Sequence, residues 1–216
     1  MENITLEQFL TVEEISQPRT PGEYIIWFEE KLEINRKFKE ELREQMLLRK
    51  GKIVEYYYNE LFPLWRLLQN KREAWKELTF VPFLGNQNFD VEVRTNRKDV
   101  PKYIEITNTD MDEKEYAINK ILFKERQADI TVSKTKEEVK NRIKEGINAK
   151  MKVTSRPDNT ALLVYFNDYN HSAFYYADKA SLLELSIFLE SLESIWQKRY
   201  FALYVVGLSG KSFWES

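Results

Sequence analysis

Two acidic side chains in neighbouring predicted strands carry the clearest chemical signal in the sequence. Apolar and polar residues alternate over 89–94 and again over 102–108, which predicts two strands that each bury one face. The connecting residues, 95–101, favour a hairpin, so we expect the strands to pair antiparallel. Asp90 and Glu105 then lie within reach of each other on the non-apolar face. Two converging carboxylates suit a hard cation such as Mg²⁺ or Mn²⁺, although half-solvated strands also carry such residues simply because one face is wet.

A third carboxylate lies on an apolar stripe of a predicted helix. The pattern over 52–68 predicts this helix, and Glu60 falls near the centre of its apolar face. A carboxylate there is costly unless it finds a proton, a cationic partner or a metal ion. Glu60 is therefore a candidate site residue, with an ion pair to Arg66 as the structural alternative. Pro63 is expected to kink or interrupt the helix.

The composition excludes several other kinds of site. The chain contains no cysteine, which excludes disulfides, cysteine nucleophiles and zinc–thiolate centres. Its single histidine, His171, cannot form a two-histidine metal motif and stands in a polar stretch typical of a loop. A net charge of -2 gives no overall sign of a polyanionic partner, so any nucleic-acid surface must be local. Because neither a secretory signal nor an apolar run of membrane-spanning length occurs, we expect a soluble, cytoplasmic protein without a membrane partner.

A lysine-rich segment is the best candidate for such a local surface. Residues 134–152 include seven positive and three negative side chains, and most of them belong to a helix predicted over 136–151. Gly146 costs this helix about 1 kcal/mol relative to alanine, which indicates a close approach to another group. The structural alternative is a solvated charged face. Beside the apolar stripe of the helix stand the three candidate phosphate contacts, Lys140, Lys144 and Lys150.

The remaining patterns predict an α/β protein. We expect an amino-terminal helical extension at 1–50, followed by one α/β domain at 51–216 that contains the sheet. The sequence shows no internal repeat and no interdomain linker. Helices are predicted over 6–15, 22–48, 109–126 and 179–197, and further strands over 79–84, 128–132, 161–166 and 200–207.

The order of these elements resembles the core of the PD-(D/E)xK, restriction-endonuclease-like superfamily. Over about residues 50–167, the helix of Glu60, three strands, the lysine-rich helix and an apolar strand follow its α-β-β-β-α-β order. The resemblance implies a mixed sheet flanked by helices, in which Asp90 and Glu105 bind Mg²⁺ and Glu60 joins them. It further implies a magnesium-dependent nuclease that hydrolyses nucleic acid, with DNA as the expected substrate. Members of that superfamily often form homodimers, but the sequence shows no interface signature and leaves the oligomeric state open.

One departure from that superfamily bears directly on activity. Thr107 occupies the position at which its members carry a catalytic lysine, and threonine cannot place a positive charge beside the scissile phosphate. Lys150 or Lys144 from the following helix, or Lys102 from the same strand, could take over this role. If none does, the resemblance implies a catalytically inactive nuclease-like domain that binds nucleic acid or a protein partner.

Overall fold

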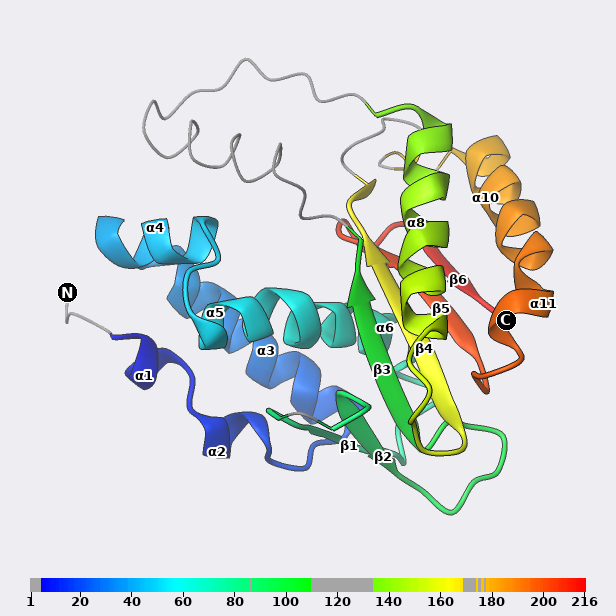
Figure 1. Ribbon diagram of the computed structural model, residues 1–216. Coiled ribbons are helices and arrows are strands. Elements are labelled where there is room, and N and C mark those ends of the chain that lie inside the picture. The colour runs from blue at the N-terminus through cyan, green and yellow to red at the C-terminus, as the bar shows by residue number, and fades with distance from the viewer. Residues whose placement is uncertain (1–4, 86, 110–133, 169–173, 175, 177) are drawn as a thin grey trace. The chain divides into compact units, whose positions relative to one another are not determined.

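The chain of 216 residues is described by a computed structural model that covers residues 5–85, 87–109, 134–168, 174, 176 and 178–216 (Figure 1). Its contacts divide the described chain into two compact units. The first unit holds residues 5–85, and the second holds residues 87–109 together with the described part of 134–216. No described helix is long and apolar enough to cross a membrane.

The first unit is built mainly from helices, and the first three of them begin at threonine side-chain caps. Thr5 and Thr20 each accept a hydrogen bond from the backbone N–H three residues later, in capping boxes completed by Gln8 and Glu23. Pro21 stands in the first turn after Thr20, where a missing N–H breaks no helical hydrogen bond. The elements are α1 (Leu6–Phe9), α2 (Val12–Ile15), α3 (Pro21–Arg36), α4 (Glu40–Leu47), α5 (Lys52–Tyr56), the π-helix η1 (Tyr57–Leu61), α6 (Phe62–Lys71) and β1 (Thr79–Pro82).

The long helix expected over 22–48 is two helices in the structure. α3 ends at Arg36 and α4 begins at Glu40. Between them Phe38 is buried, and its ring packs edge-on against Phe9 with 4.9 Å between the ring centroids. The expectation is wrong because the helical spacing of apolar residues runs through this break, while the contact that places Phe38 is made by a distant residue.

The helix that carries Glu60 is interrupted, as Pro63 predicts. It consists of α5, the π-helical turn η1 and α6, with Pro63 in the first turn of α6. The backbone N–H of Phe62 donates to the carbonyl of Tyr57, five residues earlier. Because proline has no N–H to donate to the preceding turn, a change of hydrogen-bond pattern falls immediately before it.

The boundary expected at residue 50 lies inside the first unit. Helices on both sides of it are joined by aromatic packing, because the ring of Phe28 in α3 stacks on Tyr57 with 5.0 Å between centroids. The same Phe28 ring lies 5.4 Å from that of Trp65 in α6. Residues 51–85 therefore belong with the helices that precede them.

The second unit contains a mixed β-sheet in the order β2-β3-β4-β5-β6. β2 pairs antiparallel with β3, the strands β3, β4 and β5 run parallel, and β6 pairs antiparallel with β5. Helices lie in the connections between the parallel strands, as such crossovers require. The strands are β2 (Val91–Arg94), β3 (Tyr103–Asn108), β4 (Thr160–Phe166), β5 (Leu203–Gly207) and β6 (Phe213–Glu215), and the helices are α8 (Lys136–Met151), α10 (Lys179–Ser191) and α11 (Glu193–Trp196).

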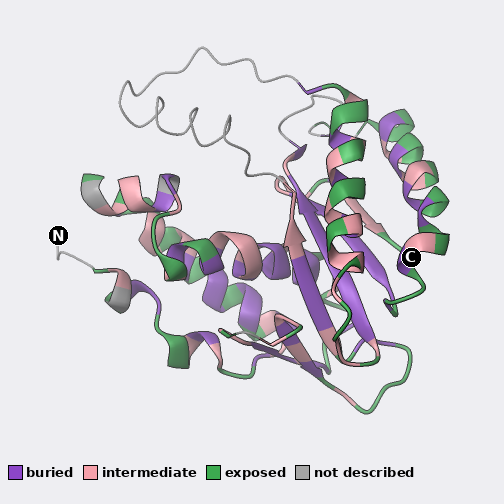
Figure 2. Ribbon diagram, viewed as in Figure 1, coloured by how far each residue is buried: buried purple, intermediate pink, exposed green. Residues whose placement is uncertain are grey.

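Helices α8 and α10 pack against the sheet and enclose its core (Figures 1 and 2). α8 begins at a capping box formed by Thr135 and Glu138, and its bounds match the predicted helix. β4 is buried along its whole length, as its continuous apolar run predicts. The expected class is thus confirmed at the level of an α/β fold with a mixed sheet flanked by helices. The core consists chiefly of Val139, Ile143, Ile147, Leu162, Val164, Phe166, Leu185, Leu189, Trp196 and Leu203.

Some expected elements have other outcomes. β6 forms in a stretch that the sequence presents only as a tail with glycine and serine, because three residues are too few for a recognisable alternation. Residues 110–126 of an expected helix, the expected strand 128–132 and His171 lie outside the described residues.

Candidate active site

The pairing of β2 with β3 brings the two predicted carboxylates together. Val91 lies opposite Ile104 in an antiparallel register, so Asp90, one residue earlier, faces Glu105. The backbone N–H of Asp90 donates to the carbonyl of Ile104 at 2.9 Å. Asp90 Oδ2 in turn accepts the backbone N–H of Ile106 at 2.5 Å. The antiparallel pairing expected from the connection at 95–101 is confirmed, and the backbone of Asp90 is hydrogen-bonded to β3.

Glu105 is a buried carboxylate that is surrounded by donors. Its residue is only 4% exposed, so its face of the sheet is not the wet face that the alternation suggests. Oε2 accepts the hydroxyl proton of Tyr200 at 2.6 Å and lies 3.3 Å from Arg156 Nε. Oε1 lies 3.0 Å from Lys150 Nζ. Asp90, Glu105, Lys150, Arg156 and Tyr200 are called the Glu105 cluster below.

The two cations of the Glu105 cluster come from consecutive segments. Lys150 stands in the last turn of α8, and Arg156 follows in the connection to β4. Arg156 Nη2 donates to the carbonyl of Lys150 at 2.7 Å, and the guanidinium lies 4.1 Å from the centroid of the Tyr200 ring. Within the described residues, Arg156 Nε and Nη1 are buried without a hydrogen-bond partner, so the contact of Nε with Glu105 is an ion pair that lacks hydrogen-bond geometry.

Asp90 has a strongly perturbed acidity. The pKa of Asp90 is raised from 3.8 to about 6, chiefly by burial and to a smaller extent by the charge of Glu105. The N–H of Ile106 and the charge of Lys150 act in the opposite direction. Perturbed acids concentrate at functional sites. An added cation would favour the ionised form of Asp90, because an opposite charge offsets the cost of burial.

The hydroxyl of Tyr200 is a permanent hydrogen-bond donor. Burial is the largest cause that raises its pKa well above the usual 10, followed by the hydrogen bond that it donates to Glu105. The phenol therefore stays protonated at any working pH. Tyr200 itself is buried in the core cluster of the second unit.

Thr107 and Gly146 mark where α8 approaches β3. A Cβ atom added at Gly146 would lie 2.8 Å from Cγ2 of Thr109 and 3.7 Å from Cγ2 of Thr107. The close approach expected at Gly146 is therefore a contact between helix and strand. This contact brings the last turn of α8, with Lys150, to the strand of Glu105. Thr107 occupies the lysine position of the resemblance, and the ammonium group beside Glu105 comes from Lys150 instead.

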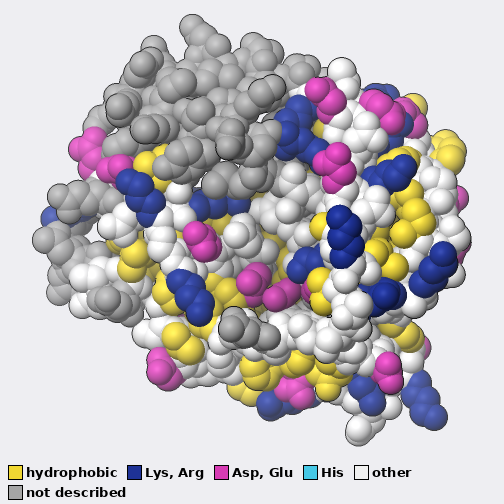
Figure 3. Space-filling model, viewed as in Figure 1, with side chains coloured by type: hydrophobic (Ala, Val, Ile, Leu, Met, Phe, Trp, Pro, Cys, Tyr) yellow, Lys and Arg dark blue, Asp and Glu magenta, His cyan; other side chains and the backbone are white. Residues whose placement is uncertain are grey.

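The other two candidate lysines have different surroundings. Lys140 Nζ lies 2.8 Å from Glu184 and 3.1 Å from Glu137, so its charge is balanced on the surface. Lys144 is exposed, and among the described residues it forms no ion pair. Figure 3 shows lysine and arginine side chains over α8. Lys144 thus places a positive charge on that helix without an ion pair to any described residue.

Glu60 lies in η1 of the first unit, whereas the Glu105 cluster belongs to the second unit. The residue Glu60 is partly buried. Its predicted place beside Asp90 and Glu105 therefore stays a prediction.

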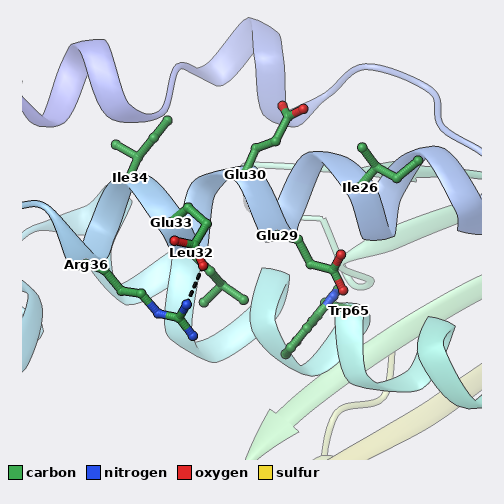
Figure 4. A pocket seen from close by; sticks show the side chains of 8 residues that line it. All are labelled: Ile26, Glu29, Glu30, Leu32, Glu33, Ile34, Arg36 and Trp65. Atoms are coloured by element: carbon green, nitrogen blue, oxygen red, sulfur yellow. Dashed lines mark hydrogen bonds and ion pairs between the residues drawn. The ribbon is translucent and has the colours of Figure 1, made fainter.

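A groove of about 820 Å³ also lies in the first unit, along α3 (Figure 4). Three glutamates line it, and Arg36, its only cationic lining residue, forms an ion pair with one of them. An acidic wall repels a polyanion, so this groove does not suit nucleic acid. It is lined by Ile26, Glu29, Glu30, Leu32, Glu33, Ile34, Arg36 and Trp65.

The Glu105 cluster fits a weakly held hard cation. Among the described residues, no group of three or more His, Cys, Asp or Glu side chains could hold a metal ion. Mg²⁺, however, commonly binds through one or two carboxylates, several waters and substrate phosphates. Only Oδ2 of Asp90 takes a hydrogen bond within the described structure, which leaves Oδ1 for a cation. The pair of Asp90 and Glu105 therefore satisfies the donor chemistry of such an ion.

Comparisons with known proteins assign the chain to no family. No protein-family model matches the chain, and no curated protein and no solved structure matches it either. The functional argument therefore depends on the site itself.

Sequence reasoning missed Arg156 and Tyr200. Arg156 stands in a polar loop, Arg156–Thr160, and Tyr200 is 95 residues from Glu105. The signal that could have found them is the buried carboxylate, because a buried charge requires partners. The place of Tyr200 depends on how β5 lies beside β4, and that of Arg156 on how the connection from α8 enters β4. Short-range sequence patterns contain neither.

Proposed function

We propose that the chain is a divalent-metal-dependent phosphodiester hydrolase that acts on nucleic acid, with DNA as the first substrate to test. The observation that carries the proposal is the position of Lys150. Its ammonium group lies 3.0 Å from Glu105, in the cluster that also holds Asp90. This grouping of two carboxylates and a lysine supports the proposed PD-(D/E)xK resemblance, although Thr107 stands at the usual lysine position. That fold assignment is part of the proposal.

Asp90 and Glu105 would hold the cation, which is Mg²⁺ or Mn²⁺. When bound, the cation would lower the pKa of a water ligand and stabilise negative charge on the phosphate. Asp90 offers its Oδ1, while the N–H of Ile106 fixes the orientation of its other oxygen. Glu105 is held by Tyr200 on one oxygen, so its carboxylate is oriented before any ligand arrives.

Lys150 would bind and neutralise the phosphate at the reacting centre. Its side chain is 28% exposed, so the ammonium can reach a ligand at the surface. A lysine presents a compact charge on a flexible stem, which suits contact with a phosphate. Lys144, which is exposed on the same helix, would contribute charge to the binding of neighbouring phosphates.

A second candidate function has its own observation. Both oxygens of Glu105 already contact protein donors, namely Lys150 on Oε1 and Tyr200 and Arg156 on Oε2. Such an arrangement stabilises a buried carboxylate without any metal ion. In this alternative the domain binds nucleic acid or a protein partner and hydrolyses nothing.

The test is cleavage of supercoiled plasmid and of labelled single-stranded DNA with Mg²⁺ or Mn²⁺. We expect nicking by the wild type that is abolished by EDTA, by Asp90→Asn and by Lys150→Met. The matched control is Lys198→Met, which removes an exposed lysine outside the cluster and should cleave normally. Metal binding without cleavage would favour the alternative, and the absence of both would overturn the proposal.

A further inference from the structure

The two oxygens of Glu105 are held in unequal ways. Oε2 contacts Tyr200, which is 4% exposed, and Arg156, whose side chain is 6% exposed. Among the described residues, Oε1 contacts only Lys150, whose side chain is 28% exposed. One edge of the carboxylate therefore faces buried groups, and the other faces a side chain that can move into solvent.

The buried edge is held firmly by its own contacts. Arg156 lies over the Tyr200 ring at 4.1 Å and donates to the carbonyl of Lys150 at 2.7 Å. Tyr200 packs in the core that α8, α10 and the sheet share. Displacing Oε2 would leave a buried phenol hydroxyl and a buried guanidinium with lost partners, which is costly.

The formal charges of the cluster cancel without a metal ion. Asp90 and Glu105 contribute two negative charges, and Lys150 and Arg156 contribute two positive charges. A divalent cation must therefore bind against the field of the two basic side chains unless one of them leaves. Lys150 is the one able to leave, because Arg156 is buried and stacked.

We propose that Tyr200 and Arg156 are positioning residues that anchor Oε2 of Glu105, and that Oε1 is an exchangeable oxygen for which Lys150 and a divalent cation compete. This inference depends on the proposed function. Lys150 occupies the cation's position in the free protein and swings to the phosphate when the cation and the substrate are present. The ammonium group of Lys150 thus balances the carboxylate charge when no cation is bound, and it contacts the phosphate when the cation and the substrate are present.

The experiment is calorimetric titration of the full chain with Mn²⁺ in the absence of nucleic acid. Tyr200→Phe removes the anchoring hydroxyl and should weaken Mn²⁺ binding roughly 10-fold, the usual effect of losing a group that orients a metal ligand. Lys150→Met removes the competitor and should strengthen binding by roughly 3- to 10-fold, because a neighbouring positive charge is lost. The matched control is Tyr204→Phe, which alters a different buried tyrosine, in β5, and should bind Mn²⁺ like the wild type.

A second readout follows Lys150 itself. Acetic anhydride labelling, quantified by mass spectrometry, should modify Lys150 faster after Mn²⁺ is added, while labelling of Lys198 stays constant. This measurement keeps the inference testable should Tyr200→Phe fail to fold.

The outcomes separate the two proposals. If the wild type binds no Mn²⁺, the proposed function is overturned and this inference with it. If the wild type binds Mn²⁺ but Lys150→Met binds it more weakly, or Tyr200→Phe binds it equally well, only the exchange at Glu105 is overturned. Unchanged labelling of Lys150 in the presence of bound Mn²⁺ would contradict it in the same way.

Discussion

A cluster in the first unit repeats the contacts of Glu105. Glu14 accepts a hydrogen bond from Trp27 Nε1 at 2.8 Å and lies 2.7 Å from Lys31 Nζ. Arg19 lies over the Trp27 ring at 4.1 Å, the same distance that separates the guanidinium and the tyrosine ring in the Glu105 cluster. Each cluster thus combines a carboxylate, a lysine, an aromatic donor and a stacked arginine. Glu14, Arg19, Trp27 and Lys31 are called the Glu14 cluster.

The two clusters differ in how completely their charged and polar groups are paired within the described structure. In the Glu14 cluster, Arg19 donates to the carbonyls of Glu14 and Gln17, and Lys31 also donates to the carbonyl of Phe9. The Glu105 cluster has a second carboxylate, Asp90, with a pKa of about 6, and two guanidinium nitrogens that have no hydrogen-bond partner among the described residues. Similar contacts can therefore close a local structure in one place and leave capacity for a ligand in another.

The largest expected effect comes from neutralising the buried carboxylate of the second unit. Glu105→Gln leaves Lys150 and Arg156 without their common counter-charge in a buried environment. Breaking a buried pair costs about 3–5 kcal/mol, so we expect a loss of that size in the free energy of unfolding, measured by urea denaturation. A loss below about 1 kcal/mol would show that solvent reaches the Glu105 cluster. The two clusters would then not differ in burial.

The next effect is a gain in stability from a neutral residue at position 90. The folded pKa of Asp90 is raised from 3.8 to about 6, so folding is penalised as pH rises through this window. Each pKa unit corresponds to about 1.4 kcal/mol. In EDTA, Asp90→Asn should therefore be about 2–3 kcal/mol more stable than the wild type at pH 7.

The pH dependence is the control for that gain. The advantage of Asp90→Asn should shrink as pH falls and disappear below about pH 3, because Asp90 is then largely protonated in both the folded and the unfolded wild type. An advantage that is independent of pH, or a variant that is less stable at pH 7, would contradict the assigned acidity of Asp90.

The smallest effect belongs to the Glu14 cluster, where neutralising the carboxylate should destabilise the protein instead of stabilising it as at Asp90. Glu14 is 29% exposed in its side chain, and its pKa is lowered: burial raises it, but the contacts with Lys31 and Trp27 outweigh burial. Its contribution is thus present at neutral pH and is lost as pH falls below the usual value of 4.5. Glu14→Gln should cost about 1–2 kcal/mol at pH 7, and the cost should shrink in acid when unfolding is followed by urea denaturation.

Much of the fold follows from local patterns in the sequence. The bounds of α8 agree with its apolar stripe and with the cap at Thr135, and the alternation around Asp90 and Glu105 places both in an antiparallel pair. The interruption at Pro63 follows from the missing N–H of proline. These features depend on neighbours within a few residues, which is why the sequence is enough to predict them.

The remaining features depend on contacts between distant segments. Helix α3 stops at Arg36, and the Phe38 that follows packs on Phe9, a contact that no helical period encodes. The partners of Glu105 arise likewise from the parallel placement of β5 and from the end of α8, so Lys150 could be named only among several lysines and Tyr200 not at all.

The most direct test of the account is site-specific paramagnetic broadening by Mn²⁺ in ¹⁵N-labelled protein. Substoichiometric Mn²⁺ should broaden the backbone amide of Ile106, which donates to Asp90. This broadening should disappear in Asp90→Asn and should persist in Glu14→Gln, which removes the carboxylate of the Glu14 cluster. Equal broadening in the wild type and in Asp90→Asn, or none at Ile106, would contradict the claim that the two carboxylates of the second unit form a cation site.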